Sequence, residues 1–368
     1  MKHLNVKRAI VLISIIGIFP AVSHSQGQIA FSTGDLVFKG DLRYRHEYIK
    51  QENTDQRDRQ RLRARLNMTA TVDKSVNFIF ALASGSSDDP ISSNQDLTGG
   101  FSDKPIWIDQ VYFDWTTPMP GLKIQGGKVK NPFLAVGRNQ LIWDHDLNPE
   151  GLSFQFTKTA APVDVFANGS FFWVQERAAD KDSYLAGGQA GVKKAGSFGD
   201  ITLGSSYFDY VHGKGYATFY DAAKSFGNSV DAKKLYLYDY RLVEAFGELN
   251  LSQFGLPIGF QGDYVTNVAK DVQKNKGYYI GASLGKTTVP GTWDIKAGYR
   301  NLEKDAVIGA FNDSDFSGGG ADNKGFVFNA DYQTAKNITL NLTWFKNTKS
   351  LTNGADYNRV QIDTNFKF

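Results

Sequence analysis

Apolar and polar residues alternate with a period of two along most of the chain, and no segment keeps a helical period. Successive side chains of an extended strand point to opposite faces, so this alternation predicts β-strands with one apolar face and one polar face. In the last strand-like segment, the apolar face carries Val360, Ile362, Thr364, Phe366 and Phe368. The pattern predicts an all-β fold, but by itself it suits a soluble sandwich as well as a membrane barrel.

Strand-like segments recur about sixteen times, an even number. They cover residues 36–48, 57–72, 76–84, 106–116, 121–130, 150–157, 163–176, 185–194, 200–210, 234–250, 257–267, 276–286, 291–301, 324–334, 337–347 and 357–368. In the segment 291–301, for example, Trp293 and Ile295 fall on the apolar face, and Asp294 and Arg300 fall on the polar face. The segment 106–116 is apolar on both faces.

The connections between these segments differ in length in a regular way. Short ones lie at 72–75, 117–120, 158–162, 194–199, 252–256, 287–290 and 335–337, and longer polar ones at 49–56, 85–105, 131–149, 177–184, 211–233, 268–275, 302–323 and 348–356. Outer-membrane barrels have short periplasmic turns and longer outer loops, whereas a soluble sandwich has no reason to keep such an alternation. We therefore predict a transmembrane antiparallel β-barrel of about 16 strands.

The N-terminus has the features of a secretory signal. Lys2, Lys7 and Arg8 precede an apolar run at 9–21, which is too short for a comfortable membrane-spanning helix. Small residues at 22–25 favour cleavage after Ser25. We predict a signal peptide over residues 1–25 and a single barrel domain over residues 26–368.

Charge and cysteine content exclude several classes of function. The 41 basic and 38 acidic residues give a net charge of +3, but three of the basic residues belong to the predicted signal. The mature chain is then close to neutral, and no nucleic-acid partner is expected. The chain has no cysteine, which excludes disulfides, thiol catalysis and thiolate metal sites.

One predicted strand has an arginine at every second position: Arg57, Arg59, Arg61, Arg63 and Arg65. The residues between them turn apolar from Leu62 onward, so the arginines are expected to face the lumen; facing lipid, each would cost about 2–4 kcal/mol near the midplane. Arg43 and Arg45 share one face of the preceding strand with Asp41 and Glu47. Two interpretations stay open and can hold together. The arginines form an electropositive strip that attracts anionic solutes, or a ladder paired with wall carboxylates that serves only to satisfy a polar interior.

Several stretches resemble the family of putative porins of bacterial outer membranes and, more distantly, phosphate-selective porins. They are 40–47, the arginine ladder, 83–85, 104–106, 126–133 and 143–151. The resemblance implies a water-filled pore, often trimeric, in the outer membrane of a Gram-negative bacterium. Phosphate-selective porins favour lysine ladders, so the arginines here do not support phosphate specificity. The C-terminus resembles the last strand of outer-membrane barrels, which implies that Phe366 and Phe368 are recognised by the barrel assembly machinery.

The third long connection, 131–149, is a candidate partner for the arginines. In general porins the third loop folds into the barrel and places acids opposite an arginine cluster. The resemblance implies a similar arrangement here, with Asp144, Asp146 and Glu150 facing the ladder and narrowing the pore. The match is one of position and not residue for residue.

Other polar clusters carry less weight. Asp144, His145 and Asp146 are adjacent in the chain and are poorly aimed as metal ligands, and the stretches 86–96 and 313–320 lack the ligand spacing and terminal Glu of a calcium loop. No serine and histidine form a recognisable nucleophile motif. We therefore expect no metal, no cofactor and no enzymatic activity.

We predict a homotrimeric porin in the lipid bilayer of the outer membrane, which transports ions and other small hydrophilic solutes passively with a tendency toward anions. Selection would depend on pore width and electrostatics. One alternative is a closed structural or adhesive barrel, which would show no single-channel conductance. Another is an outer-membrane hydrolase on a smaller barrel, which would need a Ser/His pair.

Overall fold

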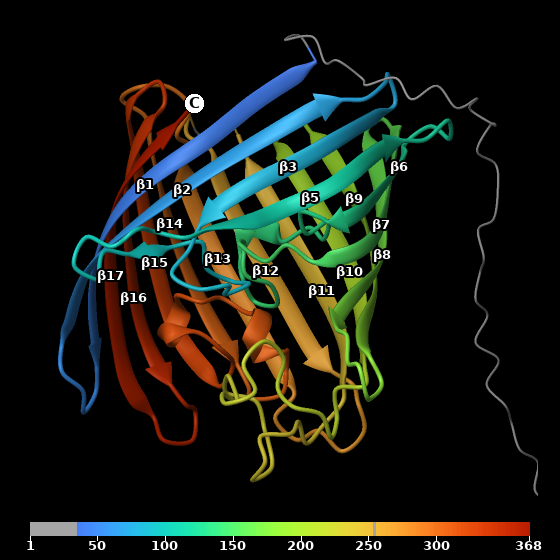
Figure 1. Ribbon diagram of the computed structural model, residues 1–368. Helices are drawn as coiled ribbons and strands as arrows, with labels where there is room; N and C mark the ends of the chain where they lie inside the picture. Colours follow the sequence, from blue (N-terminus) through green and yellow to red (C-terminus); the bar gives the residue numbers. More distant parts are fainter. Residues whose placement is uncertain (1–34, 253–254) are drawn as a thin grey trace, which may run out of the picture.

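The computed structural model describes residues 35–252 and 255–368, which form one closed β-barrel (Figure 1). The predicted signal peptide lies outside the described residues. The wall consists of β1 (Leu36–Gln51), β2 (Arg57–Thr71), β3 (Val76–Ser84), β5 (Ile106–Thr116), β6 (Leu122–Lys128), β7 (Glu150–Ala160), β8 (Val163–Gln175), β9 (Ser183–Gly196), β10 (Gly199–Val211), β11 (Tyr240–Leu251), β12 (Ile258–Asn267), β13 (Lys276–Gly285), β14 (Trp293–Leu302), β15 (Asn323–Ala335), β16 (Ile338–Lys349) and β17 (Ala355–Lys367). No helix in these residues is long and apolar enough to cross a membrane.

The barrel closes because its last strand returns to its first. Each wall strand pairs antiparallel with the next, and β17 pairs with β1 along the stretch from Asp41↔Lys367 to Gln51↔Tyr357, so no long edge is left unpaired. The two-residue strand β4 (Gln95–Asp96) continues the sheet beside β2. The prediction of an antiparallel barrel of about sixteen strands is confirmed, and every predicted strand overlaps an observed one.

The two ends of the barrel differ in their connections. One end has short turns, including 72–75, 117–121, 161–162, 197–198, 286–292 and 336–337. The other end has the long loops 85–105, 129–149, 212–239 and 303–322. Figure 1 shows the C-terminus at the end of the barrel away from most of these loops. The loops 52–56 and 350–354 are shorter than predicted because β1, β16 and β17 extend further at this end.

The two faces of the wall follow the predicted alternation. On β14, Trp293 and Ile295 are exposed on the outer, lipid-facing side, and Asp294 and Arg300 are buried on the inner side. The same holds on β15, where Phe326 and Phe328 are exposed and stack on one another with their ring centroids 6.1 Å apart.

The strand β5 corrects the prediction of a segment that is apolar on both faces. Gln110 pairs with Ala81, but Ile108 pairs with Leu82, so Asp109 is an extra residue in a β-bulge. The bulge shifts the alternation by one position, which places Ile108 on the same outer face as Phe113. Beyond the bulge, the outer face of β5 carries Val111, Phe113 and Trp115, and the inner face carries Gln110 and Asp114 together with Tyr112, which packs against the internal core.

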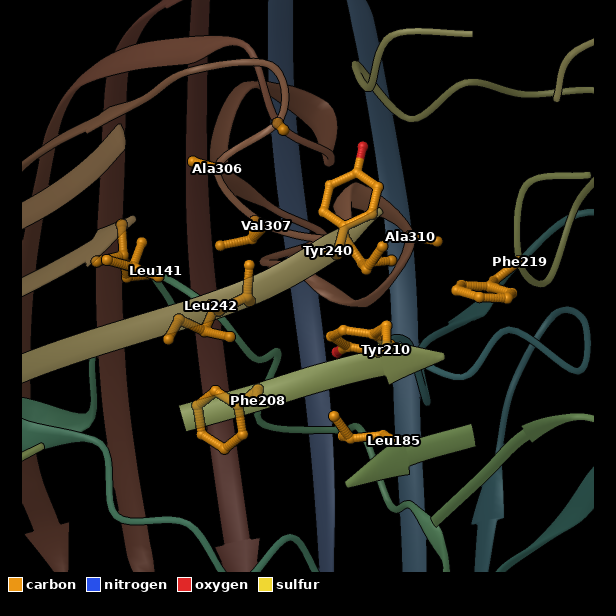
Figure 2. Packing of buried hydrophobic residues seen from close by; sticks show 14 of the residues in the cluster. Leu141, Leu185, Phe208, Tyr210, Phe219, Tyr240, Leu242, Ala306, Val307 and Ala310 are labelled. Atoms are coloured by element: carbon orange, nitrogen blue, oxygen red, sulfur yellow. The ribbon is translucent and has the colours of Figure 1, made fainter. Parts of the chain in front are cut away.

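An apolar core fills part of the barrel interior (Figure 2). The wall contributes Leu185, Phe208, Tyr210 and Leu242, and the loops contribute Leu141, Phe219, Ala306, Val307 and Ala310. Burying a large apolar side chain stabilises the fold by roughly 1.5–3 kcal/mol, so these loops are held against the wall by packing as well as by hydrogen bonds. The loops 129–149, 212–239 and 303–322 are therefore parts of the packed interior.

Candidate functional site: the arginine cluster and the loops that cover it

The five arginines of β2 lie on the inner face of the wall, where they pair with carboxylates of neighbouring strands and loops. Leu62 and Leu66 occupy outer positions on the same strand, and Leu66 is exposed there. The register with β1 places Arg43 opposite Arg63 and Arg45 opposite Arg61. Like charges that face each other directly are destabilising, so the arrangement requires carboxylates between them.

Carboxylates from β1, β4 and β17 supply this compensation. Asp41 lies 2.8 Å from both Arg63 and Arg65. Asp363 binds Arg45 through two hydrogen bonds of 2.7 Å, the bidentate geometry in which guanidinium and carboxylate interact most strongly.

Asp96 lies on β4, beside the outer-loop end of the ladder. Its carboxylate is 2.6 Å from Arg61, 3.5 Å from Arg59 and 3.7 Å from Arg57. The short strand β4 thus places one acid within reach of three arginines.

Glu47 is the centre of the inner network. Its buried carboxylate accepts a hydrogen bond of 2.6 Å from Arg359 on β17, and it also pairs with Arg59 and, at 3.7 Å, with Arg61. Gln361 donates a further hydrogen bond of 3.2 Å to it. A buried charge is tolerated only when it is paired and hydrogen-bonded, and Glu47 meets both conditions.

We call this set of charges the arginine cluster. It comprises Arg43, Arg45, Arg57, Arg59, Arg61, Arg63, Arg65 and Arg359 with Asp41, Glu47, Asp96, Asp146, Asp315 and Asp363. Each arginine of the cluster pairs with at least one carboxylate. The cluster holds eight arginines and six carboxylates, so the arginines outnumber the acids that pair with them.

Of the predicted loop acids, only Asp146 reaches the ladder. Its carboxylate is 3.4 Å from Arg65 and accepts hydrogen bonds from the Ser93 backbone and hydroxyl at 3.0 and 2.8 Å. Although burial opposes ionisation, the charges of Arg63 and Arg65 hold the pKa of Asp146 below its usual value.

Asp144 lies away from the arginine cluster. Its carboxylate accepts a hydrogen bond of 2.8 Å from the Ser314 backbone, and its own backbone N–H donates to the Phe311 carbonyl at 2.9 Å. Burial, together with the charges of Asp146 and Asp313, raises its pKa well above the usual range. Asp144 therefore joins loop 129–149 to loop 303–322 and does not face the ladder.

Glu150 is not part of the pore wall. It pairs in register with Trp173, which is exposed on the outer face, and it forms an ion pair of 2.9 Å with Lys128. The prediction placed Glu150 with the loop acids, but it is the first residue of β7 and its alternation points it outward.

Loop 129–149 is attached to the inner wall by polar and aromatic contacts. The Leu134 backbone exchanges two hydrogen bonds with the Gln189 amide, at 2.7 and 3.0 Å, and Asn139 donates one of 2.9 Å to Asp263. The Trp143 ring packs edge-on against Phe208 of the wall, with a centroid distance of 5.3 Å. These contacts hold the loop against the inner face of the wall.

Sequence reasoning missed four members of the cluster. Arg359 and Asp363 lie on the polar face of the last strand. Pairing that strand with the first across the closure would have placed Asp363 opposite Arg45 and Arg359 opposite Ile49, two residues from Glu47. Asp96 and Asp315 come from loops, and nothing in their sequence surroundings indicates a partner.

The two C-terminal phenylalanines lie at the end of the barrel with the short turns. Phe366 pairs in register with Leu42 on the outer face. The backbone of Phe368 exchanges two hydrogen bonds of 3.1 Å with Gly40, and its ring lies over the same glycine. A Cβ at position 40 would also lie 2.6 Å from the Arg65 carbonyl oxygen, so this close approach requires glycine.

A closed antiparallel barrel with charged side chains on its inner wall and long loops folded inside defines an outer-membrane channel protein of the porin class. The chain matches the family described as "Putative porin" over residues 40–238 and 236–368, and it belongs to that family. No curated protein matches it.

Solved structures of porins share the fold. A multiple mutant of the Rh. blastica porin is 13% identical, with a TM-score of 0.51, and the match covers 90% of this chain and 100% of that one. A triple mutant of the Rhodopseudomonas blastica porin is 11% identical, with the same TM-score and coverages. A loop L8 deletion mutant of OmpT, an outer membrane protein of Vibrio cholerae, is 11% identical at a TM-score of 0.51, with coverages of 91% and 100%. At these identities the likeness concerns the fold.

Proposed function

We propose that this porin is a passive diffusion channel for small hydrophilic solutes, with a tendency toward anions, in the outer membrane of a Gram-negative bacterium. The observation that carries the proposal is the excess of arginines over carboxylates in the arginine cluster. Guanidinium groups stay charged at any physiological pH, so the excess is permanent. A strip of fixed positive charge on one wall raises the local concentration of anions and draws them along that wall.

Reversal potentials in planar bilayers test this proposal. Under a salt gradient, the wild-type channel should favour anions, and Arg65→Gln should lower the anion-to-cation permeability ratio, because Arg65 is a half-exposed member of the cluster. Combining Arg61→Ala with Arg63→Ala should lower the ratio further.

Lys346→Gln is the matched control for Arg65→Gln. Lys346 pairs in register with Phe326 on the outer face, so this substitution removes one positive charge without touching the lumen. A cation-selective pore that is unaffected by the Arg61 and Arg63 substitutions would overturn the proposed selectivity.

A non-conducting structural or adhesive barrel is the second candidate, and the internal core favours it. Loops 129–149, 212–239 and 303–322 pack against the wall and occupy part of the lumen. This candidate predicts a folded, heat-modifiable barrel that gives no single-channel events. Stepwise conductance from purified protein would decide in favour of the channel.

Two partners are proposed from the family resemblance. The first is a homotrimer, which sedimentation of the protein in mild detergent would test. The second is the barrel assembly machinery, which would bind the C-terminal strand that ends at Phe368.

A further inference from the structure

The loop 303–322 places one carboxylate against two arginines of the inner wall. Asp315 lies 2.7 Å from Arg359 on β17 and 3.2 Å from Arg45 on β1. Arg359 also donates a hydrogen bond of 3.3 Å to the Asp315 carbonyl oxygen. The loop thus supplies an acid to the part of the cluster where the first and last strands meet.

The three side chains differ in their access to water. The Asp315 side chain is 21% exposed, whereas those of Arg45 and Arg359 are 5% and 3% exposed. A solute that approaches this part of the wall therefore meets the carboxylate before either guanidinium. The two arginines contribute positive charge to the cluster, and of the three side chains Asp315 is the most accessible.

The loop is held in place by contacts that do not involve the Asp315 carboxylate. Val307 and Ile308 are fully buried in the internal core. The Phe316 ring lies under the Arg300 guanidinium at 3.8 Å, and the Asn312 amide donates to the Gln140 and Leu141 carbonyls at 3.0 and 2.6 Å. Removing the Asp315 charge should therefore leave the loop folded.

The carboxylate stays ionised across the ordinary pH range. Burial by itself would raise the pKa of Asp315, but the charges of Arg359 and Arg45 outweigh burial and hold this pKa well below its usual value. A fixed negative charge at this position acts against anions whenever the channel is open.

We propose that Asp315 is a specificity-determining residue, which limits the anion preference of the pore by screening Arg45 and Arg359 from passing solutes. This inference rests on the conducting channel proposed above. On this inference, loop 303–322 supplies the acid that opposes the arginines at the closure of the barrel. Loop 129–149 supplies the acid that opposes Arg65.

The test compares reversal potentials of Asp315→Asn and wild type in planar bilayers under a potassium chloride gradient. The chloride-to-potassium permeability ratio should rise by about twofold or more, because a change of charge between low-dielectric walls strongly alters local ion concentrations. Asp313→Asn is the matched control. It removes the same charge from the same loop, but Asp313 is buried and faces Arg300, so the ratio should stay at the wild-type value.

The absence of cysteine from the chain permits a second test that does not depend on the asparagine variant. Asp315→Cys should show the raised permeability ratio. A sulfonate-bearing thiol reagent returns a negative charge to this position and should restore the wild-type ratio. An ammonium-bearing reagent adds a positive charge and should raise the ratio further. Each variant is checked for heat-modifiable mobility before it is measured.

The outcomes separate the two proposals. A folded wild-type protein without conductance overturns the proposed channel and this inference with it. A conducting wild type whose ratio is unchanged by Asp315→Asn and by the modified Asp315→Cys protein overturns the role of Asp315 alone. An equal rise of the chloride-to-potassium permeability ratio in Asp313→Asn and Asp315→Asn also overturns that role, since the effect would then not depend on the more exposed position of Asp315.

Discussion

The carboxylate of Glu47 on β1 accepts a hydrogen bond of 2.6 Å from the guanidinium of Arg359 on β17, across the seam where the first and last strands close the barrel. Both side chains are buried on the inner face, and the two residues are 312 positions apart in the chain. The seam is thus closed by a buried ion pair in addition to the backbone ladder. Because Glu47 also forms ion pairs with Arg59 and Arg61, one carboxylate connects β1, β2 and β17.

The substitution Glu47→Gln should destabilise the barrel. It leaves Arg359 with Asp315 as its remaining carboxylate partner in a buried site, and breaking a buried pair by removing one partner costs about 3–5 kcal/mol. The unfolding temperature in detergent, measured from the loss of heat-modifiable mobility, should fall clearly. Asp356→Asn is the control, because its pair with Lys346 is exposed and 3.8 Å long, and such pairs contribute at most about 1 kcal/mol. Equal unfolding temperatures for the two variants would contradict the prediction.

The substitution Trp143→Ala should loosen loop 129–149 without unfolding the barrel. The half-buried indole packs against Phe133 and Phe208. Truncating a fully buried aromatic side chain costs about 3–5 kcal/mol, so losing the half-buried indole should cost less than that and still weaken the attachment of the loop to the wall. Single-channel recordings should show a larger and noisier conductance. Trp293→Ala removes the same side chain from the lipid-facing side and should leave the conductance unchanged. A Trp143→Ala channel indistinguishable from wild type would show that the loop does not restrict the pore.

Acidification should stabilise the wild-type protein through Asp144. Burial raises the folded-state pKa of Asp144 above the usual 3.8, so the folded state binds this proton more tightly than the unfolded state does. Stability attributable to Asp144 is therefore greatest below pH 3.8 and is lost as the pH rises toward the raised pKa. The pKa values of Asp146 and Asp315 are lowered, so their contributions stay constant above pH 3.8.

The measurement is the unfolding temperature in detergent between about pH 4 and pH 7, compared with that of Asp144→Asn. As the pH falls, the unfolding temperature of wild type should rise relative to that of Asp144→Asn, because the asparagine cannot take up a proton. A difference that does not vary with pH would exclude Asp144 as the responsible group. Asp146, Asp313 and Arg300 surround this site and stay the same in both proteins.

The substitution Phe368→Ser should reduce the amount of barrel in the outer membrane. The aromatic ring lies over Gly40, at the point where the two terminal strands meet, and it belongs to the proposed assembly signal. Heat-modifiable protein in outer-membrane fractions should decrease, with unfolded chain accumulating instead. Phe260→Ser serves as a control, since this phenylalanine is also exposed on the outer face but lies in the middle of the sheet. A wild-type yield for Phe368→Ser would contradict a role in assembly.

The sequence by itself determined the barrel and the side on which its charges lie. Period-two alternation is a local property, because each side chain takes its face from its neighbours along the strand. It correctly placed Trp293 on the outer face and Arg300 on the inner face. The regular difference between short and long connections then identified the membrane barrel.

Only the tertiary structure decided which charges meet. Asp315 and Arg45 are 270 positions apart, and their contact depends on the path of a loop that no periodic pattern describes. For the same reason Asp146 reaches Arg65, whereas Asp144, two residues earlier, binds the neighbouring loop instead. The bulge at Asp109 shows that even the alternation is changed when one extra residue enters a strand. Local sequence fixes the face of each side chain, but packing between distant segments fixes its partner.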